Sequence, residues 1–145
     1  MSPHQASPPE QPEVYVGGWS IARYAQVVKW PAIVVIVMDI IVTTARWSLT
    51  LSWLFLIALS VWLGIAAKNI YQARIANAAG LGFSAGLIVG LSSSLFQFLW
   101  YHNITAFFQI VTTTFLSIII GVLMSTSAFL VVAKEQRPSE KGKRK

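Results

Sequence analysis

The sequence contains no cysteine, and charged residues make up only 11% of its 145 residues. The absence of cysteine excludes disulfides, thiolate zinc sites, cysteine-ligated iron–sulfur clusters and cysteine nucleophiles. A soluble domain carries about 25% charged residues, so the shortage of charge argues against a soluble fold. There are only two histidines, far apart in the chain, and Asp39 is the sole acidic residue between Glu13 and Glu135. We therefore expect no metal site and no cofactor.

The few charges leave two long stretches with none at all, Leu49 to Ala67 and Ile75 to Ala133. Such continuous apolar chain is typical of membrane proteins, because one helical span of a bilayer takes about 20 apolar residues. The sequence predicts an all-α polytopic membrane protein, with four transmembrane helices arranged as two antiparallel hairpins. The expected spans are about 24–45, 49–67, 81–100 and 107–132.

Polar tails flank this transmembrane domain, which is expected over residues 20–133. Residues 1–19 are rich in proline and are expected to be disordered. Residues 134–145 form a basic tail that holds six of the 11 lysines and arginines, and the net charge of the chain is +6. Lys and Arg stay mainly on the cytoplasmic side of a membrane. The N-terminus, the 68–80 loop and the C-terminus are therefore expected to be cytoplasmic, in a plasma (inner) membrane.

The basic tail also indicates a partner. Lysines and arginines that directly follow an apolar helix are attracted to anionic lipid headgroups. The sequence thus predicts contact with a bilayer whose inner leaflet is anionic, and it gives no reason to expect nucleic acid as a partner. The residues expected at the headgroups are Lys134, Arg137, Lys141, Lys143, Arg144 and Lys145.

Small residues recur every four positions along the third and fourth predicted spans. Residues four apart share one face of a helix, and small side chains let helix backbones approach closely in lipid. Three arrangements follow: the two rows pack against each other within one hairpin, one row makes a homo-oligomer, or one row lines a pore. The first row is Ala78, Gly82, Gly86, Gly90 and Ser94, and the second is Thr113, Ser117, Gly121 and Ser125.

A polar cluster is expected in the outer half of the membrane. Asp39 is an acidic residue inside a span, where a carboxylate costs about 2.5–3.5 kcal/mol, and Arg46 follows it two turns later. Gln97 and Gln109 flank the last turn symmetrically, so their amides are expected at similar depth and within bonding reach. Asp39 is interpreted either as a structural residue, protonated or hydrogen-bonded to another helix, or as a proton or ion site.

The build of four short helices with an acidic residue, Asp39, in the first resembles that of the small multidrug transporters. Asp39 comes late in its helix and its neighbours depart from that family's pattern, so no mechanism is carried over. The size and the basic C-terminal tail are similar to those of some phage holins.

No catalytic residue set is visible, so the protein is expected not to be an enzyme. The main hypothesis is an accessory, assembly or scaffold subunit that acts through helix–helix contacts, in a homo-oligomer or a larger membrane complex. The alternative is a small oligomeric transporter or pore, holin-like or coupled to protons or ions, that uses Asp39.

Overall fold

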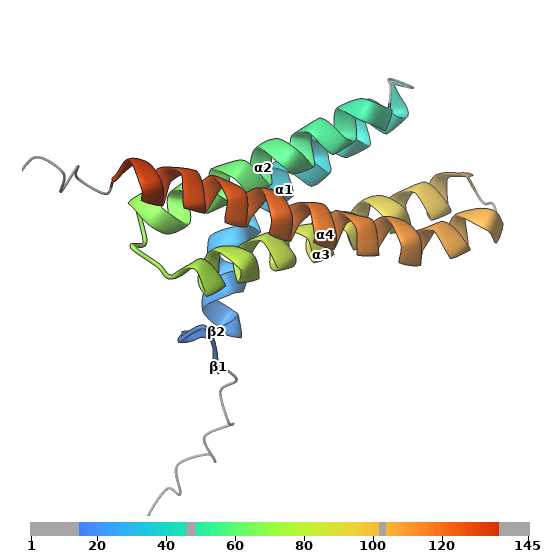
Figure 1. Cartoon of the computed structure of the whole chain (residues 1–145). Helices are drawn as coiled ribbons and strands as arrows, with labels where there is room; N and C mark the ends of the chain where they lie inside the picture. The colour runs from blue at the N-terminus through green and yellow to red at the C-terminus, as the bar shows by residue number, and fades with distance from the viewer. Residues whose placement is uncertain (1–14, 46–48, 102–103, 137–145) are drawn as a thin grey trace, which may run out of the picture.

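Four helices make up nearly all of the computed structural model, which describes residues 15–45, 49–101 and 104–136 (Figure 1). They are α1 (Ile21–Thr44), α2 (Leu49–Asn69), α3 (Ile75–Tyr101) and α4 (Ile104–Glu135). Each is long and apolar enough to cross a membrane. The predicted all-α bundle of four transmembrane helices in two hairpins is confirmed, and the chain is a multi-pass membrane protein.

The helices extend beyond the apolar spans that the sequence predicts. Helix α3 begins at Ile75 rather than near Leu81, and α4 ends at Glu135 rather than near Val132. The prediction followed the apolar run, whereas a helix continues into the headgroup region as long as its backbone hydrogen bonds are made. The connection between α2 and α3 is therefore only five residues long, and it turns through Gln72 with a positive φ of 45°.

Helix α1 changes direction in its first half. In Figure 1, the blue first turns cross the start of α3, whereas the cyan remainder runs alongside α2. Pro31 lies inside the helix, and a proline removes one backbone hydrogen bond and bends a helix. The first turns, up to Trp30, thus run across the bundle, and the rest of α1 runs along it.

The last residues of the predicted disordered tail are ordered, which corrects that prediction for residues 15–19. Tyr15–Val16 (β1) and Trp19–Ser20 (β2) pair as an antiparallel hairpin. The turn consists of Gly17 and Gly18 with φ of 61° and 87°, and glycine adopts such values at no steric cost. Composition predicted disorder because it ignores this turn and the burial of Trp19. Residues 1–14 lie outside the described residues.

A polar contact fastens the hairpin to α3. Trp19 is buried, with the Arg23 guanidinium 4.3 Å from its ring centre. The side-chain amide of Asn77 forms two hydrogen bonds in the orientation that suits its surroundings. Its nitrogen donates to the Gly17 carbonyl oxygen at 2.7 Å, and its oxygen accepts from Trp19 Nε1 at 2.9 Å. The Tyr24 hydroxyl lies 3.4 Å from the same amide. These contacts link the start of α1 to the start of α3.

The two rows of small residues lie against each other between α3 and α4. A Cβ atom built on Gly82 would come within 2.2 Å of the Gly121 carbonyl oxygen, and one on Gly86 within 2.4 Å of the Ser117 carbonyl oxygen. The Ser125 hydroxyl donates to the Ala78 carbonyl oxygen at 2.7 Å. Backbones this close leave no room for any side chain larger than hydrogen. The rows are thus used within one hairpin.

Helix α2 joins the same contact at a glycine that the sequence analysis did not single out. A Cβ on Gly64 would lie 2.2 Å from the Ser125 carbonyl oxygen. Ser60, one turn earlier, is fully buried and donates back to the Leu56 carbonyl oxygen at 2.8 Å. The small residues of α2, α3 and α4 therefore form one packed seam.

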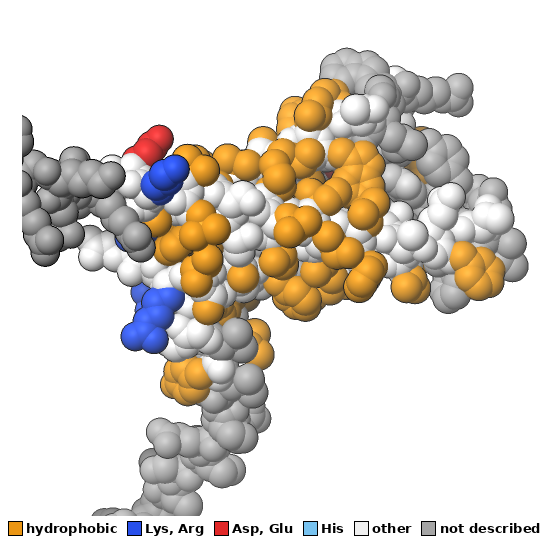
Figure 2. Space-filling model, in the orientation of Figure 1, with side chains coloured by type: hydrophobic (Ala, Val, Ile, Leu, Met, Phe, Trp, Pro, Cys, Tyr) orange, Lys and Arg blue, Asp and Glu red, His pale blue; other side chains and the backbone are white. Residues whose placement is uncertain are grey.

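Basic residues gather at one end of the bundle, and apolar side chains form a broad band beside them (Figure 2). The end carries the first turns of α1, the α2–α3 connection and the end of α4 (Figure 1). Gln136 Nε2 donates to Asn69 Oδ1 at 2.6 Å there and ties α4 to α2. The Lys and Arg residues of the described ranges are Arg23, Lys29, Lys68, Arg74 and Lys134.

Candidate functional site

All four helices line one cavity of about 410 Å³. Its floor and walls mix apolar side chains with hydroxyl and amide groups, which is unusual inside a transmembrane bundle, since polar residues there are costly. The lining comes from α1 (Val35, Asp39), α2 (Ser52, Trp53, Leu56), α3 (Val89, Ser93, Gln97) and α4 (Phe108, Gln109, Thr112, Thr113, Ser117).

The cavity holds the carboxyl group of Asp39, whose side chain is only 2% exposed. Asp39 lies five residues before the end of α1, roughly 7.5 Å along the axis at 1.5 Å per residue. The Ser93 hydroxyl of α3 donates to Asp39 Oδ2. The other oxygen, Oδ1, is buried and has no hydrogen-bond partner in the described part of the chain. One carboxyl oxygen is thus held in place, and the other is left without a partner among the described residues.

Several hydroxyl groups near this carboxyl are also buried without a partner among residues 15–45, 49–101 and 104–136. They belong to Thr43, one turn after Asp39, to Ser52 in the cavity wall, and to Ser94 and Thr114 on the facing helices. A buried polar atom without a hydrogen bond costs about 1–3 kcal/mol. Of these residues, Ser52 lines the cavity together with Asp39, and a polar space of this size accommodates water. We therefore interpret the cavity as hydrated.

The structure brings together three of the four residues of the predicted polar cluster. Asp39, Gln97 and Gln109 line the same cavity, in which Gln109 is exposed and Gln97 is half-buried. No hydrogen bond joins the two amides among the described residues. Arg46 lies outside those residues, as do five members of the predicted headgroup set, Arg137, Lys141, Lys143, Arg144 and Lys145.

Sequence reasoning missed Ser93, the residue that contacts Asp39. The run Ser92–Ser94 was visible, but nothing in it indicates which hydroxyl faces α1. The spacing offers a clue in retrospect, because Ser93 lies four residues before Gln97 and so shares its helix face. The same spacing relates Gln109 to Thr113 and Ser117, which also line the cavity.

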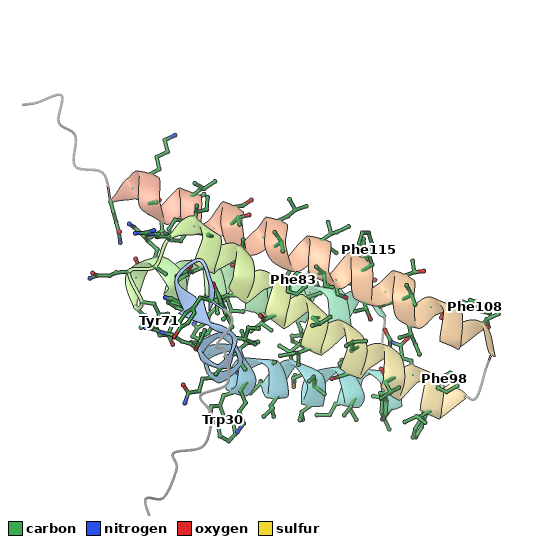
Figure 3. The ribbon with its side chains drawn as sticks, turned by 90° about the horizontal axis from the view of Figure 1, so that it is seen from below. Trp30, Tyr71, Phe83, Phe98, Phe108 and Phe115 are labelled. Carbon is green, nitrogen blue, oxygen red and sulfur yellow. The ribbon has the colours of Figure 1, made fainter. Side chains whose placement is uncertain are left out.

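The aromatic lining was missed as well. Trp53 of α2 and Phe108 of α4 contribute rings to the cavity wall. Figure 3 shows Phe108 at the far end of α4 from the basic end, on the part of the bundle where Phe98 also lies. Phe108 is 71% exposed, so its ring stands at the rim of the cavity.

Comparison with family models, with curated proteins and with solved structures finds no match. The chemistry of the site is therefore inferred from its own residues.

The groups in the cavity that could bind a cation are the oxygen atoms of one carboxyl group, several hydroxyls and two amides. Among the residues that the structure describes, no three His, Cys, Asp or Glu side chains come together, so the donor set does not suit a transition metal. Oxygen donors around a single negative charge suit a proton, an alkali cation or a small ammonium ion. Aromatic rings in the wall add to the attraction of an ammonium ion.

Proposed function

We propose that this protein is a small, non-enzymatic cation transporter in which Asp39 is the binding and coupling residue. The observation that carries the proposal is the buried, unpartnered Oδ1 of Asp39, a residue that lines a polar cavity between all four helices. Binding a proton or a monovalent cation at that oxygen removes the cost of a buried, uncompensated charge.

A purely structural role of Asp39 explains the environment of only one of its two carboxyl oxygens. The Ser93 hydrogen bond satisfies Oδ2, and a structural aspartate would need a second donor for Oδ1. The described basic residue nearest along the chain is Lys29, ten residues before Asp39 and roughly 15 Å along α1. Among the described residues, no basic side chain thus lies beside Asp39 along α1, and the proposal assigns the compensating charge to an exchangeable cation.

The size of the cavity favours a solute larger than a bare ion. Small-molecule sites occupy about 300–1,000 Å³, and this cavity of about 410 Å³ falls at the lower end of that range. Apart from Asp39, its lining is made of hydroxyl, amide, aromatic and aliphatic side chains. A small cationic solute that alternates with a proton at Asp39 would use all of these groups.

The accessory or scaffold role is the second candidate, and the exposed face of α4 favours it. Only 22% of the α4 span is buried, against 33–39% for the other three helices. The rows of small residues no longer support this role, because α3 and α4 use them on each other. Such a subunit would not need the Asp39 carboxylate, and this separates the two candidates.

The proposed setting is a plasma (inner) membrane with both ends of the chain in the cytoplasm. The basic end of the bundle supports this orientation, since Lys and Arg concentrate on the cytoplasmic side. The Asp39 cavity then lies in the half of the membrane farther from the cytoplasm, and Lys134 remains a proposed contact for anionic headgroups of the inner leaflet.

Carbodiimide labelling tests whether Asp39 binds cations. Dicyclohexylcarbodiimide partitions into membranes and modifies protonated carboxyl groups there, so the reconstituted protein is expected to gain one adduct on Asp39, located by mass spectrometry. Sodium or tetramethylammonium chloride is expected to slow the reaction at least threefold, because an occupied carboxylate does not react. The Asp39→Asn variant is the negative control, because it has no carboxyl group at this position. Labelling that proceeds at the same rate with every cation would mean that Asp39 is structural.

A further inference from the structure

A second hollow of about 460 Å³ lies along α1, and none of its lining residues lines the Asp39 cavity. Its walls are almost entirely apolar, and Gln26 and Lys29 are the two polar residues that line it. We call it the α1 groove. It is lined by Ala22, Ala25, Gln26, Lys29, Ala32, Ile33, Ile36 and, from α3, Ile88.

The α1 groove spans the bend of α1. Its first part, with Ala25, Gln26 and Lys29, belongs to the turns that cross the bundle at the basic end (Figure 1). Its second part, with Ile33 and Ile36, follows Pro31 on the stretch that runs along the bundle. With the basic end of the bundle at the headgroups, the groove would lead from the headgroups toward the acyl chains.

Charge at the groove selects an anion. Lys29 is exposed, and its Nζ lies 5.4 Å from the ring centre of the neighbouring Trp30, which is 68% exposed. Such Lys and Trp pairs are typical of the membrane–water interface. No carboxylate of the described residues pairs with Lys29. Its ammonium group and the NH₂ group of the exposed Gln26 amide thus offer hydrogen-bond donors and one positive charge beside an apolar groove.

We propose that the α1 groove binds one anionic phospholipid from the leaflet at the basic end of the bundle. Its phosphate contacts Lys29 and Gln26, and one acyl chain lies along Ile33, Ile36 and Ile88. The small side chains of Ala25 and Ala32 make the room for that chain. This site does not depend on cation binding at Asp39, and it is separate from the lipid contact expected of the C-terminal tail.

Native mass spectrometry tests the proposal on the full chain. The protein is released from micelles that contain equal amounts of phosphatidylglycerol and phosphatidylcholine with identical acyl chains. The first bound lipid is expected to be phosphatidylglycerol by about fivefold, the effect of one lysine at an anionic surface. Lys29→Gln should reduce that ratio to about one.

Two further variants make the result specific. Ala25→Leu places a larger side chain in the groove and should lower retention of both lipids at least threefold, while leaving the ratio unchanged in what remains. Arg74→Gln removes an exposed basic residue outside the groove and should keep the fivefold preference. All three positions are exposed, so folding is not at risk. Equal retention of the two lipids by the wild type, or an equal loss in Arg74→Gln and Lys29→Gln, would overturn the proposal.

Discussion

The cation-dependent proton flux of the Asp39→Asn variant is expected to be at least about tenfold lower than that of the wild type, while its abundance and membrane insertion stay unchanged. Asparagine keeps the size of the side chain and an oxygen that accepts from Ser93. It cannot take up a proton or hold a cation by charge. Hydrogen bonds to charged groups contribute about 1.5–3 kcal/mol, so tenfold is the lower limit of the effect.

The measurement is fluorescence of pyranine trapped in proteoliposomes, with a gradient of sodium or tetramethylammonium chloride across the membrane. Ser84→Ala is the matched control, because the Ser84 hydroxyl lies on α3 as well but donates within its own helix, to the Gly80 carbonyl oxygen at 2.9 Å. Asp39→Asn vesicles that respond like the wild type would exclude Asp39 as the coupling residue and leave the accessory role as the better account.

Gly82→Leu is expected to lower the free energy of unfolding by about 3 kcal/mol, the upper part of the usual range for overpacking. The first side-chain atom would already lie 2.2 Å from a backbone oxygen of α4 and 2.9 Å from Ser125 Cβ. Backbone cannot move aside as a flexible side chain does. Helices α3 and α4 must therefore separate, and the contacts of Gly86 and Gly121 are lost with them.

Unfolding of the purified protein in mixed micelles, followed by circular dichroism as the fraction of dodecyl sulfate rises, measures this change. Ala58→Leu is the control, since Ala58 is exposed on α2 and the same side chain there meets lipid or detergent. Equal midpoints for the two variants would contradict the packing of α3 on α4 through small residues.

The fold could be predicted from the sequence because one physical effect dominates it. Long runs without charge belong in lipid, and in lipid only helices satisfy their own backbone. Helix ends could not be placed as well, because α3 and α4 continue past the apolar residues into polar surroundings. The β-hairpin was missed because its stability comes from Asn77, which is about 60 residues away from Gly17 in the chain.

The candidate site could be predicted in part. Asp39, Gln97 and Gln109 were expected in one region because polar residues inside spans avoid lipid and the outer turn places both amides at similar depth. Ser93, Trp53 and Phe108 could not be assigned, because their roles depend on how the two hairpins are rotated against each other. That rotation is set by contacts between residues far apart in the chain, such as Gly64 with Ser125. The periodicity within one helix gives no information about such contacts.

The central claim is that a negatively charged, water-accessible cavity lies inside the membrane at Asp39. Because the chain has no native cysteine, a single Gln97→Cys side chain reports on that cavity alone, with Ser84→Cys as the control outside it. Positively charged methanethiosulfonate should react with Gln97→Cys at least about tenfold faster than its negatively charged analogue, and Asp39→Asn should abolish that preference. Equal rates with the two reagents, or no reaction at all, would contradict the claim.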